Sequence, residues 1–206
     1  LRQERLTGQK RLLDDDGVKF GDEWEEFSIS DLCKIGRGRV ISKTEIEENF
    51  GSYPVYSSQT LSNGIMGYLN SYDFDGEYVT WTTDGVNAGT VFYRNGKFNC
   101  TNVCGTLSPK NNLINLKFLA LALSRVAFKY VSHTLANPKL MNGVMGTITI
   151  QVPKIEEQEK IAQVLTTADR EIDLYQQQLD ELKLEKKSLM QQLLTGQKRV
   201  KLGGEY

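Results

Sequence analysis

Residues 161–193, IAQVLTTADREIDLYQQQLDELKLEKKSLMQQL, decide the architecture of the C-terminal part of the chain. Alternating steps of four and three pick out one stripe, formed by Ile161, Leu165, Ala168, Ile172, Tyr175, Leu179, Leu182, Lys186, Leu189 and Leu193. All of these except Lys186 are apolar or Tyr, and no Pro or Gly interrupts them, which is typical of a coiled-coil helix. At about 1.5 Å per residue the helix forms a rod of roughly 50 Å. One helix cannot bury so narrow a stripe on itself, so the pattern predicts a partner helix, with packing on the chain's own core as the alternative.

A repeat marks the end of this helix. The six residues LTGQKR occur at residues 194–199 and again, letter for letter, at residues 6–11. Because chance does not account for such a match, it predicts that the chain starts with the end of an earlier helix of the same kind. We therefore expect the tail of a preceding helix and a linker in residues 1–22, a globular domain in residues 23–153 and the long helix in residues 154–200.

The globular domain has the pattern of a β-rich fold. Short runs rich in β-branched and aromatic residues, such as EYVTWTT and AGTVFYR, are separated by four turn signals, Asn63-Gly64, Asp75-Gly76, Asp84-Gly85 and Asn95-Gly96. They predict an antiparallel, hairpin-rich sheet. One helix over residues 116–132 and a closing strand that ends at Pro153 complete the prediction, which is an α+β domain followed by a long C-terminal helix.

The composition is typical of a soluble globular protein, with 39% hydrophobic and 25% charged residues in 206. The longest apolar-rich stretch, residues 116–131, contains Arg125 and Lys129 and is too short to span a bilayer. The N-terminus has no leader pattern, so we expect a cytoplasmic protein. Because the formal net charge is −1, any contact with nucleic acid has to use a local surface.

The sequence predicts no metal and no cofactor. Cys33, Cys100, Cys104 and His133 could supply four zinc ligands, but their spacing is not that of a zinc knuckle, and buried free cysteines are the favoured interpretation. The glycines of Gly36-Arg37-Gly38 lack the spacing of a phosphate-binding loop, and no dinucleotide-binding fingerprint is present.

The sequence also predicts no catalytic residue. Asp73, Asp75 and Glu77 could form a nuclease site, but the strand after them lacks the nearby lysine of restriction-type nucleases. An acidic hairpin surface is the favoured interpretation. Ser57 and Ser58 have only His133 as a possible base and no motif around them.

Polar residues on glycine-flanked loops are the strongest functional signal of the domain. Their side chains are of the types that pair with base edges or phosphates in DNA. The residues predicted to bind DNA are Ser57, Ser58, Gln59, Asn63, Thr82, Thr83, Asp84, Asn87, Arg94, Asn102 and Lys139, with Asn99 and Asn137 as further members of the group. Aromatic residues that could pack on sugars and phosphates are Tyr53, Tyr56, Tyr68, Trp81 and Tyr93.

Several stretches resemble one protein family. TITIQVPKIEEQEKIAQVL at residues 147–165, an Asp-x-x-Ile at residues 169–172 and LMQQLLTGQKR at residues 189–199 are similar to the conserved region of specificity subunits of type I restriction-modification systems. GDEWEEFSISDL, NGIMGY and EYVTWTTDGVNAGTVFYR resemble one of that family's target-recognition domains. The resemblance covers nearly the whole chain, and one departure is Lys154, where the family usually has a second proline.

The resemblance implies a function. Specificity subunits of this family alternate target-recognition domains with conserved helices that pair antiparallel, so this chain looks like the C-terminal half of one, or a natural half that works as a homodimer. Its domain would read one half of a bipartite target in double-stranded DNA, and its helix would set the spacing. The helix would also dock methyltransferase subunits and, through them, restriction subunits, so S-adenosylmethionine, ATP and magnesium would belong to those partners. The alternatives are a helical scaffold that reads no DNA and a self-contained nuclease.

Overall fold

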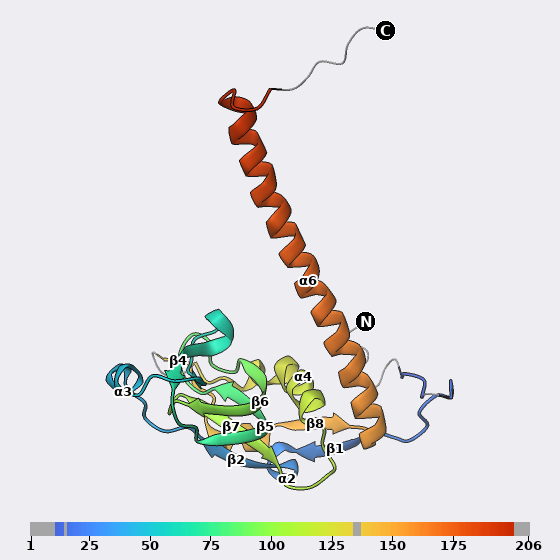
Figure 1. Cartoon of the computed structure of the whole chain (residues 1–206). Coiled ribbons are helices and arrows are strands. Elements are labelled where there is room, and N and C mark those ends of the chain that lie inside the picture. The colour runs from blue at the N-terminus through green and yellow to red at the C-terminus, as the bar shows by residue number, and fades with distance from the viewer. Residues whose placement is uncertain (1–10, 15, 134–136, 200–206) are drawn as a thin grey trace. The chain divides into compact units, whose positions relative to one another are not determined.

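The computed structural model describes residues 11–14, 16–133 and 137–199 (Figure 1). Of the first LTGQKR copy, only Arg11 lies within the described residues. The chain divides into two compact units, residues 1–162 and residues 163–206, so the border falls inside the long C-terminal helix.

Two sheets form the framework of the first unit. Their strands are β1 (Glu25–Ser28), β2 (Cys33–Arg37), β3 (Tyr53–Tyr56), β4 (Ile65–Leu69), β5 (Phe74–Thr82), β6 (Val91–Cys100), β7 (Cys104–Pro109) and β8 (Thr149–Val152). The larger sheet has the order β2-β7-β5-β6-β3-β4, and β1 pairs with β8 in the smaller one. The paired strands are antiparallel except for β3 and β6, which run parallel. The predicted α+β class is confirmed.

The described helical segments are α2 (Ile29–Leu32), α3 (Lys43–Glu48), η1 (Leu61–Gly64), α4 (Leu116–Val126), η2 (Ala127–Tyr130), α5 (Asn142–Thr147) and α6 (Ile155–Leu194). The side chain of Asn115 starts α4 by accepting hydrogen bonds from the N–H groups of Lys117 and Phe118. α4 packs on β5 and β6 and buries Phe118 completely. The single helix predicted over residues 116–132 is wrong at its end, because the buried Ala127 starts a 3-10 turn.

The larger sheet is strongly coiled. Phe98 pairs with Phe74 at the start of β5, whereas Cys104 pairs with Thr82 at its end. A nine-residue strand such as β5 spans roughly 30 Å, yet only residues 101–103 separate β6 from β7. β5 and β6 therefore curl so far that the end of β6 meets the start of β7, where Phe98, Cys100 and Cys104 form one buried cluster.

Two of the four predicted turns are wrong. Gly76 and Gly96 lie opposite each other inside β5 and β6, with φ of +107° and +97°. Such φ values suit glycine and occur where paired strands bend, so these residues help the hairpin to curl and do not reverse the chain. Asn63-Gly64 and Asp84-Gly85 do lie in connections between strands.

α6 is a continuous 40-residue helix, as its heptad pattern predicts. Ile161 and Leu165 are buried, but seam residues from Ile172 onward are exposed, including Leu179 at 47% and Leu182 at 62%. None of the helices in the described ranges has the length and hydropathy needed to cross a lipid bilayer.

Candidate nucleic-acid interface

Two loops that carry predicted DNA-binding residues lie against each other and form what we call the two-loop surface. Residues 57–64 join β3 to β4, and residues 83–90 join β5 to β6. The amide of Asn87 donates a hydrogen bond of 3.2 Å to the carbonyl of Ser58 and ties the loops together. Gln59 closes its own loop by donating to the carbonyl of Ile65. The predicted residues on these loops that are exposed or half-buried therefore lie close together, while Thr83 is buried beneath them.

Arg94 supports the first loop from inside the coiled sheet. Its side chain is only 4% exposed, and Nη2 donates to the carbonyl of Asn63 at 2.8 Å. The guanidinium lies over the rings of Tyr56 and Phe92, 3.6 and 4.3 Å from their centroids. Burial lowers the pKa of Arg94, and the nearby phenol of Tyr56 opposes the effect, so the guanidinium remains charged. Arg94 thus holds the loop in place from below.

Arg37, at the end of β2, supports the second loop. Its Nη2 lies 3.3 Å from Thr83 Oγ1 and 3.2 Å from the carboxylate of Asp84, and its Nε donates to the carbonyl of Asn102. Lys139 pairs with the other oxygen of Asp84 at 3.0 Å. This network joins residues 83–84 to three distant segments of the chain, and it brings together four of the residues that the sequence predicts.

The network carries a local excess of positive charge. Burial by itself raises the pKa of Asp84, but hydrogen bonds from Thr83 and Lys139 and the charges of Lys139 and Arg37 outweigh burial and lower it. Asp84 is therefore ionised at neutral pH, and the two cations exceed it by one charge. A chain of net charge −1 needs such a local excess to attract phosphates.

Arg37 is not predicted as a site residue from the sequence, although the glycines on either side of it, Gly36 and Gly38, are a signal of close backbone packing. A Cβ on Gly38 would lie 2.2 Å from the carbonyl oxygen of Cys100, and one on Gly36 would lie 2.6 Å from Thr106 Oγ1. Only glycine permits this close approach. The two glycines let the end of β2 pass close to the curled sheet, and that position brings Arg37 to the second loop.

Exposure separates the predicted residues into two groups. Thr82, Thr83, Arg94 and Asn99 are buried, so their side chains face the interior in this conformation. The exposed or half-buried members are Ser57, Ser58, Gln59, Asn63, Asp84, Asn87, Asn102, Asn137 and Lys139. Two apolar residues that the sequence does not single out, Leu61 and Val86, are 80% and 88% exposed, one on each loop.

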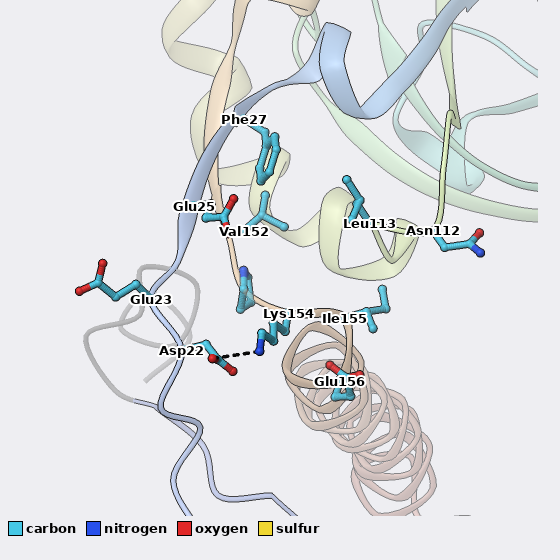
Figure 2. A pocket seen from close by; sticks show the side chains of 11 residues that line it. Asp22, Glu23, Glu25, Phe27, Asn112, Leu113, Val152, Lys154, Ile155 and Glu156 are labelled. Carbon is cyan, nitrogen blue, oxygen red and sulfur yellow. Dashed lines mark ion pairs between the residues drawn. The ribbon is translucent and has the colours of Figure 1, made fainter.

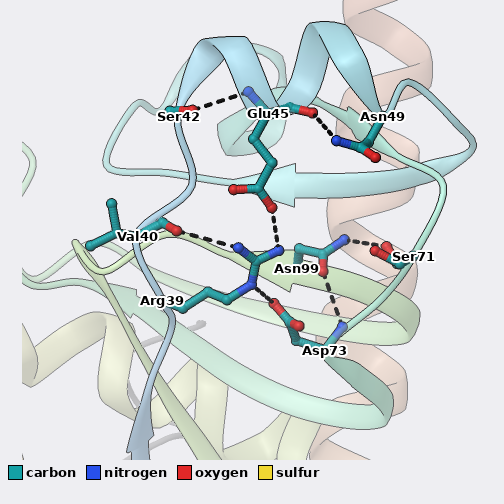
Figure 3. Close-up of polar contacts among 8 residues, drawn as sticks. All are labelled: Arg39, Val40, Ser42, Glu45, Asn49, Ser71, Asp73 and Asn99. Carbon is teal, nitrogen blue, oxygen red and sulfur yellow. Dashed lines mark hydrogen bonds and ion pairs between the residues drawn. The ribbon is translucent and has the colours of Figure 1, made fainter.

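Asp73, one of the acidic residues weighed as a nuclease site, has a structural role (Figure 3). Its carboxylate lies 2.9 Å from Arg39 Nε, and the same guanidinium lies 2.6 Å from Glu45. The buried Asn99 accepts a hydrogen bond from the N–H of Asp73 at 3.0 Å and donates to the carbonyl of Ser71 at 2.8 Å. Both Asp73 and Asn99 therefore fix the start of β5.

The other candidates for a nuclease or zinc site also have local surroundings that suit a structural role. Glu77 accepts a hydrogen bond from the hydroxyl of Tyr93. Cys33, Cys100 and Cys104 are buried and free, and burial raises the pKa of the Cys33 thiol to about 12. Within the described ranges no three Cys, His, Asp or Glu side chains gather as metal ligands would.

A hollow of about 510 Å³ lies near the start of α6 (Figure 2). Phe27 and Val152 contribute apolar surface from β1 and β8, and Lys154 pairs with Asp22 at 3.0 Å. The acidic residues that line it are Asp22, Glu23, Glu25 and Glu156. This excess of negative charge is unfavourable for DNA phosphates, which leaves the two-loop surface as the better candidate.

Comparisons with known sequences agree on one family. The family model described as "Type I restriction modification DNA specificity domain" matches residues 21–184. A type I specificity subunit of Mycoplasma pneumoniae, S.MpnORF289P N-terminus, is 52% identical over 141 residues, which are 68% of this chain and 75% of that protein. The type I restriction enzyme MpnII specificity subunit of the same organism is 46% identical over 168 residues, covering 76% of this chain and 51% of that protein.

Solved structures support the fold. The S subunit of a type I restriction-modification system from M. genitalium matches 82% of this chain with a TM-score of 0.62 and 18% sequence identity. The HsdS subunit from Thermoanaerobacter tengcongensis matches 93% of this chain with a TM-score of 0.61 and 13% identity. The matches cover 45% and 49% of those two chains, so this chain spans about half their length.

Proposed function

Because this chain belongs to the family of type I restriction-modification DNA specificity domains, we propose that its two-loop surface reads one half of a bipartite DNA target. Its relatives are specificity subunits, the non-catalytic components of these systems. The observation that carries the proposal is the convergence of two loops, braced from below by Arg94 and Arg37, that presents amides and hydroxyls together. Rigid loops rich in such groups suit direct readout of bases.

The proposal assigns different roles to the predicted residues. Side chains exposed on or beside the loops, such as Gln59, Asn63 and Asn102, contact bases or sugars, and Lys139 contacts phosphate. The buried Arg94, like Thr82 and Thr83, positions the loops.

The exposed apolar tips fit the same proposal. Leu61 and Val86 would cost free energy if they stayed in water, and apolar side chains in a groove contact the methyl groups of thymine. One such side chain stands on each of two joined loops, so both tips can reach the same stretch of groove. Their targets would then include A·T pairs.

The helix completes the proposed unit. Residues 23–153 form the target-recognition domain, and residues 154–200 form the spacer that pairs antiparallel with a second conserved helix. A rod of roughly 50 Å exceeds one turn of B-DNA, about 34 Å, so pairing holds two recognition surfaces at a fixed separation. The helix and its surroundings would dock methyltransferase subunits and, through them, restriction subunits.

Two asparagines that flank β4 allow a matched test. Asn63 lies on the two-loop surface before β4, and Asn70 is an exposed asparagine after its other end. In cells that express the chain with its methyltransferase partner, sequencing of methylated adenines should show a motif that Asn63→Asp alters or weakens at least about tenfold, since a carboxylate repels phosphate and cannot donate to a base. Asn70→Asp should leave the motif unchanged.

The same experiment separates DNA reading from a scaffold role. A motif unaffected by Asn63→Asp, Gln59→Ala and Val86→Ala would move the reading surface elsewhere. Co-purification with the methyltransferase without any methylation motif would favour a helical scaffold that reads no DNA.

A further inference from the structure

Arg11 occupies a built site in the first unit. Its Nε and Nη2 each lie 2.6 Å from one oxygen of the Glu157 carboxylate, which makes a bidentate ion pair. Nη1 donates to the carbonyl of Asp22 at 2.9 Å. The guanidinium lies 6.0 Å from the ring centroid of Trp24, whose indole N–H donates to Glu157 at 3.2 Å. We call Glu157, Trp24 and the carbonyl of Asp22 the arginine site.

The arginine site requires a cation. Glu157 is only 1% exposed, and a buried carboxylate without a partner is strongly destabilising. Its two oxygens accept from a planar fork, a geometry that arginine matches and lysine does not. The site is therefore selective for an arginine side chain.

Arg11 is the last residue of the first LTGQKR, and Arg199 is the last residue of the second. Arg199 is exposed, beyond the end of α6, where Gly196 at φ +74° ends the helix. The chain thus holds one arginine site and two arginines in the same local sequence, of which Arg11 fills the site.

The heptad seam places Arg199 opposite the arginine site in an antiparallel pair. The whole seam from Ile161 to Leu193 has its midpoint at residue 177, and the midpoint between Glu157 and Arg199 is residue 178. Ile161 and Leu165 at the start of this seam are already buried within their own copy, so the contacts between copies come from the exposed part that begins at Ile172. A two-fold axis through the centre of the seam therefore brings Arg199 of one copy level with Glu157 of the other.

We propose that the arginine site accepts Arg199 of a second copy of this chain in exchange for Arg11. This inference rests on the antiparallel pairing of the proposed function and adds the residue that fixes its register at both ends. Each copy donates Arg199 and presents Glu157, so one dimer contains two equivalent sites.

Sedimentation equilibrium measures how much Arg199 contributes to dimerisation. Arg11→Ala leaves Arg199 as the arginine available to the site, and in that background Arg199→Ala should weaken dimerisation by at least about tenfold, because Glu157 then stays buried and unpaired. Lys198→Ala in the same background removes a neighbouring exposed cation and should change the dissociation constant less than about threefold.

A second measurement uses the site with Arg11 in place. A photoreactive benzophenone side chain at position 197, in a mixture of ¹⁴N- and ¹⁵N-labelled chains, should crosslink between copies to the peptide containing Trp24 or Glu157. Arg199→Ala should reduce these crosslinks several-fold, whereas Lys198→Ala should not. This readout remains decisive if Arg11→Ala fails to fold.

The outcomes separate the arginine exchange from the helix pairing. A dimer that Leu179→Asp dissociates but Arg199→Ala leaves unchanged, without crosslinks to the site, would overturn the arginine exchange and retain the helix pairing. A monomer at all concentrations would overturn both, while the reading of DNA by the two-loop surface would still stand on its own methylation test.

Discussion

The β5–β6 hairpin and α6 are both long elements, yet they place their apolar residues differently. The hairpin bends at the paired Gly76 and Gly96 and buries Phe98 within its own curl. α6 contains no glycine and leaves Leu179 and other seam residues exposed. The hairpin thus buries its apolar surface within one chain, whereas the seam of α6 is exposed and, in the proposed function, is covered by a second helix. In the proposed function, the sheet supports the two-loop surface that reads DNA, and α6 connects two such domains.

The largest expected effect comes from substitutions in the seam of α6. The double variant Leu179→Asp/Leu182→Asp should weaken self-association by about 4 kcal/mol or more, roughly 1000-fold, because charged groups replace the central apolar contacts. Sedimentation equilibrium measures the change, and circular dichroism should show the β-rich domain intact. Leu174→Asp/Leu184→Asp is the control, since both leucines are exposed on the same helix but off the seam. Equal disruption by both variants would contradict the proposed seam.

The next largest effect tests how closely the end of β2 packs against the curled sheet. Gly38→Ala should lower the free energy of unfolding by about 3 kcal/mol, because its Cβ would lie 2.2 Å from the carbonyl oxygen of Cys100 and the backbone cannot yield cheaply. Urea unfolding followed by tryptophan fluorescence measures it. Gly143→Ala, whose Cβ meets nothing within 4 Å, should change stability by less than about 1 kcal/mol. A tolerated Gly38→Ala would show that β2 approaches the curl less closely.

Arg94 tests the link between the curl and the two-loop surface. Arg94→Leu should lower the free energy of unfolding by about 2 kcal/mol, because the carbonyl of Asn63 loses its donor and Tyr56 loses its cation. Hydrogen exchange in residues 57–64 should accelerate, while self-association through α6 should not change. Lys97→Leu, which removes an exposed cation, is the control. Unchanged exchange in residues 57–64 would mean that Arg94 does not brace the loop.

The same contrast explains what the sequence predicts well. The length and continuity of α6 follow from a periodicity that is local in sequence, so they can be read directly. Gly76 and Gly96 are misread, because a glycine after Asp or Asn marks a tight turn and a strand bend with the same letters. The role of Arg94 depends on Asn63, 31 residues away, and that of Arg37 on Asp84, 47 residues away. Such partners become neighbours only through the curl of the sheet.

The smallest expected effect concerns Asp84 and the pH dependence of stability beside the two-loop surface. Hydrogen bonds and cations lower the pKa of Asp84 below its ordinary value of 3.8 despite burial, so its ionised form stabilises the folded state above that pH. This contribution is lost as the pH falls below 3.8 and through the lowered pKa. Because Asp84 is partly exposed, we expect this contribution to the free energy of unfolding to be less than about 1 kcal/mol.

Asp84→Asn should therefore lose slightly less stability than the parent chain between pH 6 and pH 3 in urea unfolding. Asp180→Asn on α6, where the carboxylate pairs with Lys183 in solvent, is the control and should differ less. Equal slopes for all three chains would show that the cluster of Arg37, Asp84 and Lys139 adds positive charge to the surface without stabilising the fold.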